Sequence, residues 1–458
     1  MVIYDKGLPS LPDDIICEIF DLLDIKALKS CSLTGKALSC STKPFLHRTL
    51  NLTHRSGILQ ESNAPGRWNE LEGLPILGKR GLLQHIRHLS IVLSTHGPLF
   101  AHDLEPHIQH LHTLTNLTNF KVSSLDTPSF VPKMEEYFGA FLGTLRSLEL
   151  EFPRGDHEQI LYLICQFPNL RDLKINDVNG HINSMRNGGP RPDIKTSPPL
   201  DGTLDFRLGI YTESESDSMG AQLILSSLAA LPSGLKFRTL KVSECTDNNL
   251  QLLVDACAPT LERMELTGEQ FGASFFTKWS VFCSPLSYNS TVSGTPPYPP
   301  LNFKRHPRLR QLEINLTRGE DTEGAARWLS ETLSTVTSNV FTELTIHVPP
   351  FHTASEDQTR AWNSVDNVLD RLSQCEGVTL VVKLQHWVEE GQIETDFPLM
   401  WRNGRVTLDM PSPYMEDELI AGVPLSIWLA AQPREGRPPS IGTLFAQEFI
   451  HFAQINGG

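Results

Sequence analysis

Positive charge is scarce in this sequence: 39 lysines and arginines stand against 53 acidic residues, which gives a formal net charge of −14. This balance argues against a general phosphate-binding role, so nucleic acid is not an expected partner. No apolar run approaches the roughly 20 residues that cross a bilayer. Residues 1–6 also lack a basic region followed by an apolar one, so we expect neither a membrane-spanning segment nor a secretory signal.

Cysteine is scarce as well, with eight residues in 458 and no close pair of the C-x-x-C kind. A reduced, intracellular protein with scattered buried thiols is the simplest interpretation, and it implies a cytoplasmic or nuclear location. The sequence also contains no Gly-rich phosphate loop and no G-x-S-x-G or H-E-x-x-H motif. We therefore expect a protein that is not an enzyme and that holds no cofactor.

One cluster of histidines is a candidate metal site. It consists of His102, His107, His110 and His112, of which His107 and His110 could share one helical face. No arrangement of cysteines or carboxylates completes a tetrahedral site around them, so we expect no metal. A metal-assisted hydrolase at this cluster is kept as an alternative.

The first 50 residues have a pattern of their own. Pro12 stands where a helix can begin, and Asp13 and Asp14 complement the positive end of the helix dipole. Apolar residues then recur at spacings of three and four up to Leu23, and two shorter helical patterns follow, separated by Gly35, with the second ending toward Pro44. Three short helices form a very small core, so part of their apolar surface needs a partner or a neighbouring domain.

From about residue 80 a short phrase recurs: apolar, two polar, apolar, one polar, apolar. Eight good copies are present, at residues 86–91, 117–122, 145–150, 170–175, 237–242, 261–266, 309–314 and 341–346. Weaker copies of the phrase lie at residues 204–208, 378–382 and 406–408. Leu148 and Leu173 lie 25 residues apart, and Leu240 and Met264 lie 24 apart. These periods are typical of repeats in which a strand is followed by a returning helix.

The phrase indicates strands with one buried side. Alternate residues of a strand share a side, so Leu240 and Val242 should point inward and Lys241 outward. Because no single repeat can bury both its strand and its helix, neighbours must stack, and we predict an α/β fold: an irregular solenoid of parallel strands and helices, shaped as a horseshoe. An ordinary α/β domain is the alternative.

These patterns divide the chain into three parts. We expect a helical domain at residues 1–55, the solenoid at residues 80–410 and a C-terminal cap at residues 411–458. Two stretches rich in Gly, Pro, Asn or Ser, residues 179–199 and 283–300, are expected to be loops between repeats.

The helical domain resembles a known family. Residues 11–23 read Leu-Pro, two acids and then an apolar helix, and residues 28–33 read Leu-Lys-Ser-Cys-Ser-Leu. These segments resemble the first two helices of an F-box, and residues 45–50 resemble the segment that leads many fungal F-box proteins into their recognition domain. Thr34 and Leu38 depart from the family, which usually has Val and Trp there. A helical cap on the solenoid is the alternative.

One repeat carries a second resemblance. Residues 237–266 are similar to the cysteine-containing leucine-rich repeat of many F-box proteins, with Cys245 after the strand and Cys257 at the end of the helix. Cys165 stands at the matching helix end of an earlier repeat. We expect these cysteines to be small buried apolar residues rather than nucleophiles.

Together the resemblances imply the substrate-receptor subunit of an SCF (Skp–cullin–F-box) ubiquitin ligase, which holds a target near a recruited ubiquitin-conjugating enzyme. The implied partners are a Skp-family linker with its cullin complex and an unidentified target protein. The residues expected to bind the linker are Leu11, Pro12, Ile15, Ile16, Ile19, Phe20, Leu23, Leu28 and Leu33. The alternative is a leucine-rich-repeat scaffold that has lost its coupling to the ligase.

Target binding is predicted at the outward strand positions, which line the concave face of such a solenoid. Lys174 and Lys241 are basic while Glu265 and Glu313 are acidic, and Thr345 continues the same position. This ordered change of sign would form a bipolar strip that suits a charged peptide or protein surface. The other interpretation is that these are merely solvated strand residues.

Overall fold

In the computed structural model the chain divides into two compact units, Met1–Glu265 with Arg305–Leu309 and Leu266–Lys304 with Arg310–Gly458. The structure describes residues 13–34, 36–53, 70–92, 108–123, 134–151, 153, 155–178, 182–183, 199–208, 215–243, 248–268, 299–316, 322–348, 356–375, 377–384, 397–403, 406–409, 419–420 and 423–424. Within these ranges, no helix combines the length and the apolar character needed to cross a membrane.

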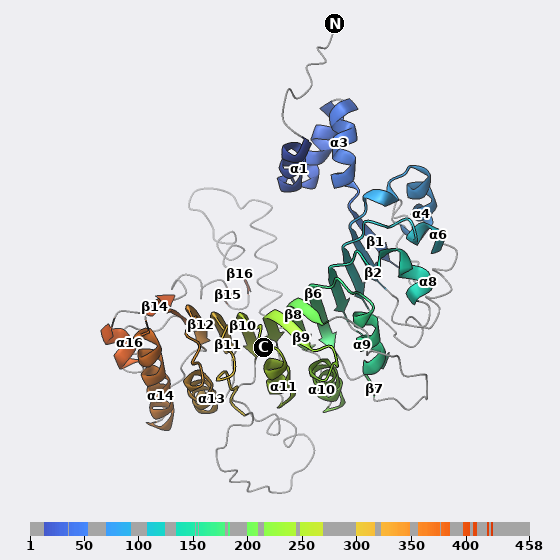
Figure 1. The fold of residues 1–458 in the computed structure, drawn as a ribbon. Coiled ribbons are helices and arrows are strands. Elements are labelled where there is room, and N and C mark those ends of the chain that lie inside the picture. The colour runs from blue at the N-terminus through green and yellow to red at the C-terminus, as the bar shows by residue number, and fades with distance from the viewer. Residues whose placement is uncertain are drawn as a thin grey trace, which may run out of the picture. The chain divides into compact units, whose positions relative to one another are not determined.

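Three helices open the first unit: α1 (Asp13–Leu22), α2 (Ile25–Thr34) and α3 (Lys36–Leu46) (Figure 1). The Asp24 carboxylate caps α2 by accepting a hydrogen bond from the Ala27 N–H at 2.6 Å. The sequence predicted that the third helix would end toward Pro44, but Pro44 lies inside α3. It removes one hydrogen bond of the helix ladder, and the His47 N–H still donates to the Lys43 carbonyl at 3.1 Å.

These helices share a small interior. The rings of Phe20 and Phe45 meet edge to face with centroids 5.5 Å apart. Leu28 on α2 and Thr42 on α3 are buried as well. The Thr42 hydroxyl donates a hydrogen bond to the Leu38 carbonyl of its own helix at 2.8 Å. So few buried side chains confirm that this group of helices encloses little apolar surface.

The rest of the first unit is an open sheet whose strands follow one another in chain order, and each neighbouring pair from β1 to β9 is parallel. Its strands are β1 (Thr49–Thr53), β2 (His88–Val92), β3 (Asn119–Ser123), β4 (Ser147–Glu151), β6 (Asp172–Val178), β8 (Leu200–Leu208), β9 (Leu235–Ser243) and β10 (Arg263–Gly268). The segments between them contain α4 (Glu70–Lys79), η2 (Leu83–His85), α6 (Ile108–Leu111), α8 (Met134–Phe138), η5 (Gly139–Phe141), α9 (His157–Cys165), α10 (Glu215–Ala229) and α11 (Asn248–Ala256).

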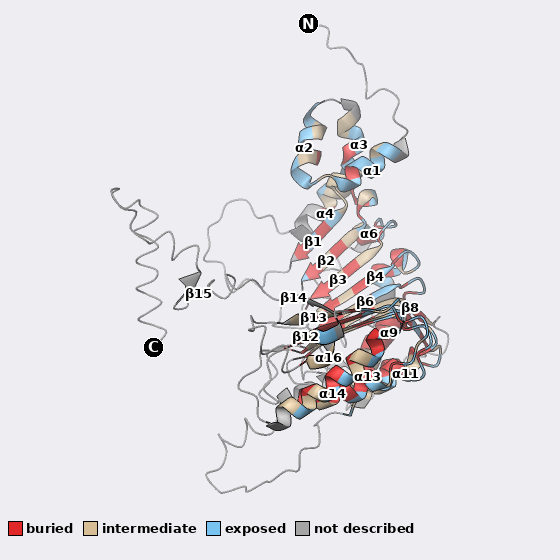
Figure 2. Ribbon diagram, turned by 90° about the vertical axis from the view of Figure 1, so that its left-hand side faces the viewer, coloured by how far each residue is buried: buried red, intermediate tan, exposed pale blue. Residues whose placement is uncertain are grey.

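Strand and helix side chains bury one another in this unit. Leu148 and Leu150 of β4 are fully buried while the residues between and beside them are not, which is the alternation that the phrase predicted. On α9, Ile160 and Ile164 are fully buried as well. Figure 2 shows buried segments on the strands and on the helices that follow them. The arrangement is compatible with the predicted solenoid.

A recurring hydrogen-bond arrangement aligns the starts of the strands. The Arg87 carbonyl, directly before β2, accepts the N–H groups of Thr118 and Asn119 at 2.9 Å each. The carbonyls of Arg48 and Arg146 accept two N–H groups of the next strand start in the same way. Consecutive strands are therefore held in one register at this edge of the sheet.

The second unit continues the alternation. Its strands β11 (Gln311–Leu316), β12 (Glu343–Val348), β13 (Thr379–Leu384) and β14 (Val406–Asp409) pair in parallel and in chain order. Its helices are α13 (Thr322–Ser334), α14 (Glu356–Ser373) and α16 (Pro398–Asn403). Two short strands, β15 (Leu419–Ile420) and β16 (Val423–Pro424), pair with each other in antiparallel fashion. Trp328 and Trp362 are buried on α13 and α14, so these helices carry the largest side chains of the core.

Each of the eight copies of the phrase overlaps a strand, but one loop prediction needs correction. The stretch at residues 179–199 was expected to be a loop, yet it contains β7 (Ile182–Asn183), which pairs with β5 (Gly155–Asp156). The weaker copy at residues 204–208 lies in the nine-residue β8, where Leu204 and Phe206 are fully buried. Most of the expected cap at 411–458 and of the loop at 283–300 lies outside the described residues.

Candidate functional site

The first helix carries apolar side chains on two neighbouring stripes. Ile16, Phe20 and Leu23 follow a spacing of four and three; Phe20 is 4 % exposed and the other two are half-buried. This stripe packs toward α3, as the contact between Phe20 and Phe45 shows. It supplies the interior of the helical group.

The second stripe lies one residue earlier and faces solvent. Ile15, Ile19 and Leu22 follow the same spacing, and their exposed fractions are 38 %, 41 % and 87 %. On α2, Ile25 and Leu33 are 63 % and 86 % exposed. We call these five residues the exposed apolar face.

Their concentration separates this face from ordinary surface scatter. Of the nine large apolar side chains that are exposed among the described residues, five lie between residues 15 and 33. Single exposed apolar residues need no explanation, whereas a contiguous patch of them marks an interaction surface, and these five residues are the candidates for such a patch. Full burial of an exposed side chain of this size contributes about 1.5–3 kcal/mol. Leu22 and Leu33, which are 87 % and 86 % exposed, would gain most of this, whereas Ile15 and Ile19 would gain less than half.

The structure divides the residues that were predicted to bind a linker. Ile15, Ile19 and Leu33 belong to the exposed apolar face, whereas Phe20 and Leu28 lie in the interior of the helical group. Ile16 and Leu23 are half-buried, and Leu11 and Pro12 lie outside the described residues. The prediction did not include Leu22 and Ile25. For Leu22 the spacing of three from Ile19 was the available signal.

A second candidate surface is the outward side of the sheet in the first unit. From β3 to β9, register places one charged residue of each strand side by side with alternating sign, and the Lys241–Glu265 ion pair extends this alternation to β10. We call this set the charge row: Lys121, Glu149, Lys174, Asp205, Lys241 and Glu265. Opposite charges on neighbouring strands stabilise a sheet, and like charges would destabilise it, so the row favours this one register.

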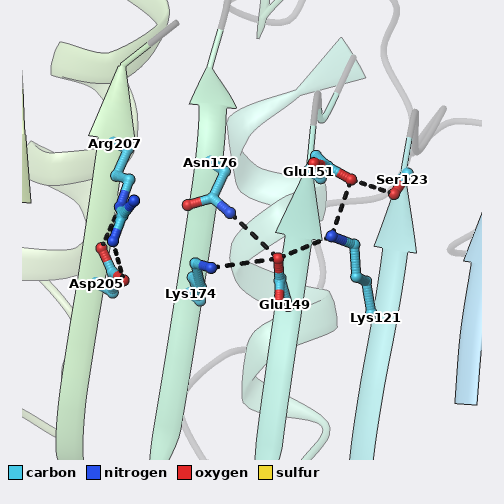
Figure 3. A network of polar contacts seen from close by, with 8 residues as sticks. All are labelled: Lys121, Ser123, Glu149, Glu151, Lys174, Asn176, Asp205 and Arg207. Carbon is cyan, nitrogen blue, oxygen red and sulfur yellow. Dashed lines mark hydrogen bonds and ion pairs between the residues drawn. The ribbon is translucent and has the colours of Figure 1, made fainter. Parts of the chain in front are cut away.

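Glu149 contacts residues of both neighbouring strands (Figure 3). Its Oε1 lies 3.0 Å from the Lys121 Nζ and 3.4 Å from the Lys174 Nζ, and it accepts a hydrogen bond from the Asn176 Nδ2 at 3.2 Å. Lys121 also reaches the Glu151 Oε2 at 3.1 Å. One carboxylate thus links β3, β4 and β6.

The other members of the row are paired as well. The Lys241 Nζ lies 2.6 Å from the Glu265 Oε2. The Arg207 guanidinium donates to both oxygens of Asp205, at 3.0 Å and 3.1 Å, along the same strand. Because each carboxylate has a cation beside it, this surface offers a nearly neutral, hydrogen-bonded pattern rather than a strong field.

Titration of the row follows from these contacts. Partial burial acts to lower the pKa of Lys121, but hydrogen bonds to Glu149 and Glu151 and their negative charges outweigh it and raise the pKa. Burial acts to raise the pKa of Glu151, but hydrogen bonds from Ser123 and Lys121, with the nearby positive charges, lower it. A hydrogen bond to Asp205 raises the pKa of Arg207. These groups stay ionised over a wide range of pH.

The ordered change of sign predicted from the sequence is wrong. Asp205 lies on β8, between Lys174 on β6 and Lys241 on β9, so the two lysines are not neighbours. The sequence phrase is weak at β8, and Asp205 was therefore not assigned to the row. Glu265 pairs directly with Lys241, so these two residues form an ion pair and not two separate poles.

The remaining predicted target-binding position lies in the second unit. The Glu313 Oε1 is 3.2 Å from the His347 Nε2 on the next strand. Thr345, which was expected to face outward, is only 8 % exposed. At the outward strand positions, the second unit therefore has a carboxylate–histidine contact and a buried threonine, where the first unit has lysine–glutamate pairs.

The histidines and cysteines form no metal site in the part of the chain that the structure describes. No three His, Cys, Asp or Glu side chains there are placed to hold a metal ion. His102 and His107 lie outside that part, and the His112 Nε2 hydrogen-bonds to the Glu136 carbonyl at 2.5 Å. Burial raises the pKa of Cys257 to about 12, so its thiol stays protonated.

No protein-family model matches the chain, and no curated protein matches it at a significant level. The two surfaces therefore have to be interpreted from their own chemistry.

Proposed function

We propose that the protein is the substrate-receptor subunit of an SCF-type ubiquitin ligase. In this proposal the three N-terminal helices are an F-box that binds a Skp-family linker with its cullin complex, and the sheet units are leucine-rich repeats that hold a target protein. The work of the chain is to raise the effective concentration of the target near a recruited ubiquitin-conjugating enzyme. The proposed location is the cytoplasm or the nucleus.

One observation carries the proposal: the exposed apolar face on α1 and α2. A group of helices with so small an interior buries little of its own surface, and five large apolar side chains remain in solvent. A partner that covered them would bury apolar area at the centre of its interface, where binding energy concentrates. The F-box resemblance of residues 11–33 supports a Skp-family linker as that partner.

The repeat part supports the second half of the proposal. Parallel strands in chain order, most of them followed by a described helix, leave their outward side chains partly exposed along many repeats. The polar groups of that side are held in fixed positions by the contacts of Glu149 and Lys241. A rigid surface of this kind can bind a protein without ordering many side chains on binding.

The linker interaction can be tested by calorimetric titration of the purified full chain with a Skp-family linker. Leu22→Asp and Leu33→Asp replace side chains that are 87 % and 86 % exposed, so neither change should alter folding. We expect each to weaken linker binding by at least about tenfold, because a charge enters an apolar contact. Leu252→Asp is the matched control, because Leu252 is 52 % exposed on α11, outside the helical group.

Linker binding by the wild type and the control, with loss in the other two variants, would support the proposal. Equal binding by all four proteins would overturn the assignment of this face. If the wild type does not bind a linker at all, the alternative gains support, in which the repeats serve as an interaction scaffold without ligase coupling.

A further inference from the structure

Arginines recur at one position of the repeats in the first unit, directly before the strand. Arg87 precedes β2, Arg146 precedes β4 and Arg171 precedes β6, and all three side chains are exposed. We call them the arginine strip. Arg48, directly before β1, stands at one end of it.

Backbone contacts place these residues in a line. The Arg48 carbonyl accepts the Arg87 N–H at 2.8 Å, and the Arg146 carbonyl accepts the Arg171 N–H at 2.8 Å. Thr118 occupies the position between Arg87 and Arg146. With about 4.8 Å between neighbouring strands, Arg146 and Arg171 start about 5 Å apart, and the strip extends over about 15 Å.

The strip differs from the charge row in that its cations are not neutralised. Among the described residues, no carboxylate forms an ion pair with Arg87, Arg146 or Arg171, whereas Arg48 pairs with Asp21 at 2.6 Å. The positive field reaches a neighbour: burial, followed by the charges of Arg48 and Arg87, lowers the pKa of His88. Adjacent unpaired cations repel one another, and a bound anion would relieve that repulsion.

The spacing favours an extended ligand over a single small anion. Guanidinium groups bind carboxylates in a bidentate manner, and an extended peptide advances about 3.3 Å per residue, so four or five residues would follow the strip. The strip contains no aromatic side chain on which a base could stack, which favours a peptide over a nucleic acid.

The geometry points to the arginine strip as a docking site for an acidic, extended segment of a target protein, rich in Asp and Glu. This inference deepens the proposed function, since it names the chemistry of the target and rests on the repeats being the target-binding part. It also moves the site from the outward side of the strands to the edge at which they begin.

The test measures fluorescence anisotropy of a labelled peptide of alternating Glu and Ser, about 12 residues long so that it spans the strip. The full chain is compared with R146Q/R171Q, with the charge-preserving R146K/R171K, and with K26Q/K29Q. The last is the matched control, because it removes two positive charges at exposed positions of α2. A peptide with Gln in place of Glu measures binding that does not depend on charge.

We expect R146Q/R171Q to weaken binding by at least about tenfold and the control by less than about twofold. R146K/R171K should lie between them, because lysine keeps the charge but not the bidentate geometry. Equal affinity of R146Q/R171Q and the control would overturn the inference. Tighter binding of a single-stranded oligonucleotide of equal charge, with the same sensitivity to R146Q/R171Q, would overturn the assignment to a peptide.

The same variants separate this inference from the proposed function. R146Q/R171Q should bind the Skp-family linker as the wild type does, since the strip lies outside the exposed apolar face. Failure of the wild type to bind a linker, with peptide binding intact, would count against the ligase and not against the strip.

Discussion

Two neighbouring residues of β9 give the sharpest test of the strand register. Leu240 is fully buried, whereas Lys241 points outward and its Nζ lies 2.6 Å from the Glu265 Oε2. Leu240→Ala removes buried apolar atoms and leaves a cavity, which costs about 2–5 kcal/mol of unfolding free energy. Lys241→Gln removes one ion pair between side chains that are 36 % and 29 % exposed. Solvent screens such a pair, so its loss costs only about 0.2–1 kcal/mol.

Urea unfolding followed by circular dichroism measures both changes. We expect the midpoint to fall clearly for Leu240→Ala and barely for Lys241→Gln, with the effect of the second variant shrinking further in high salt. Comparable losses in the two variants would refute the reasoning, because a shift of register by one residue exchanges the buried and exposed sides of the strand.

Three further predictions concern the charge row, the helical group and the cysteines. Glu151 should contribute to stability above its ordinary pKa of 4.5, and this contribution should be lost as pH falls through the lowered pKa of the folded state. Lys121 should contribute below its ordinary pKa of 10.5, and this contribution should be lost as pH rises through the raised pKa of the folded state. The unfolding free energy of Glu151→Gln should therefore approach that of the wild type only at acidic pH, and that of Lys121→Gln only at alkaline pH. A difference from the wild type that stays constant across pH would contradict the pairing. Phe20→Ala should destabilise the helical group by about 3–5 kcal/mol, seen as faster amide exchange in residues 13–46, and unchanged exchange would place Phe20 outside the interior. A thiol reagent at pH 8 should modify the exposed Cys40 and leave Cys257 intact in the folded chain, and rapid labelling of Cys257 would contradict its burial.

The strands were largely predictable because the phrase reports a local property. Leu148 and Leu150 alternate with polar residues, and this period of two specifies a half-buried strand without knowledge of distant residues. β8 was harder to recognise because its Leu204 and Phe206 lack the first apolar residue of the phrase. β8 pairs with β6 and β9, and these neighbouring strands are distant from it in sequence.

The surfaces were less predictable, since they depend on register and on packing. Asp205 could not be assigned to the charge row without the pairing of β6, β8 and β9, because the connections between repeats differ in length. On α1 the sequence showed one broad apolar stripe. Only the packing of Phe20 on Phe45 shows which half is buried and which half, including Leu22, stays exposed.

The most direct test of the account is hydrogen–deuterium exchange of the full chain with and without a Skp-family linker. We expect slower exchange on linker addition in residues 13–34, where the exposed apolar face lies, and unchanged exchange in strands β2 to β9. Protection confined to the strands, or no protection at a linker concentration far above that of the chain, would contradict the claim that α1 and α2 bind the linker.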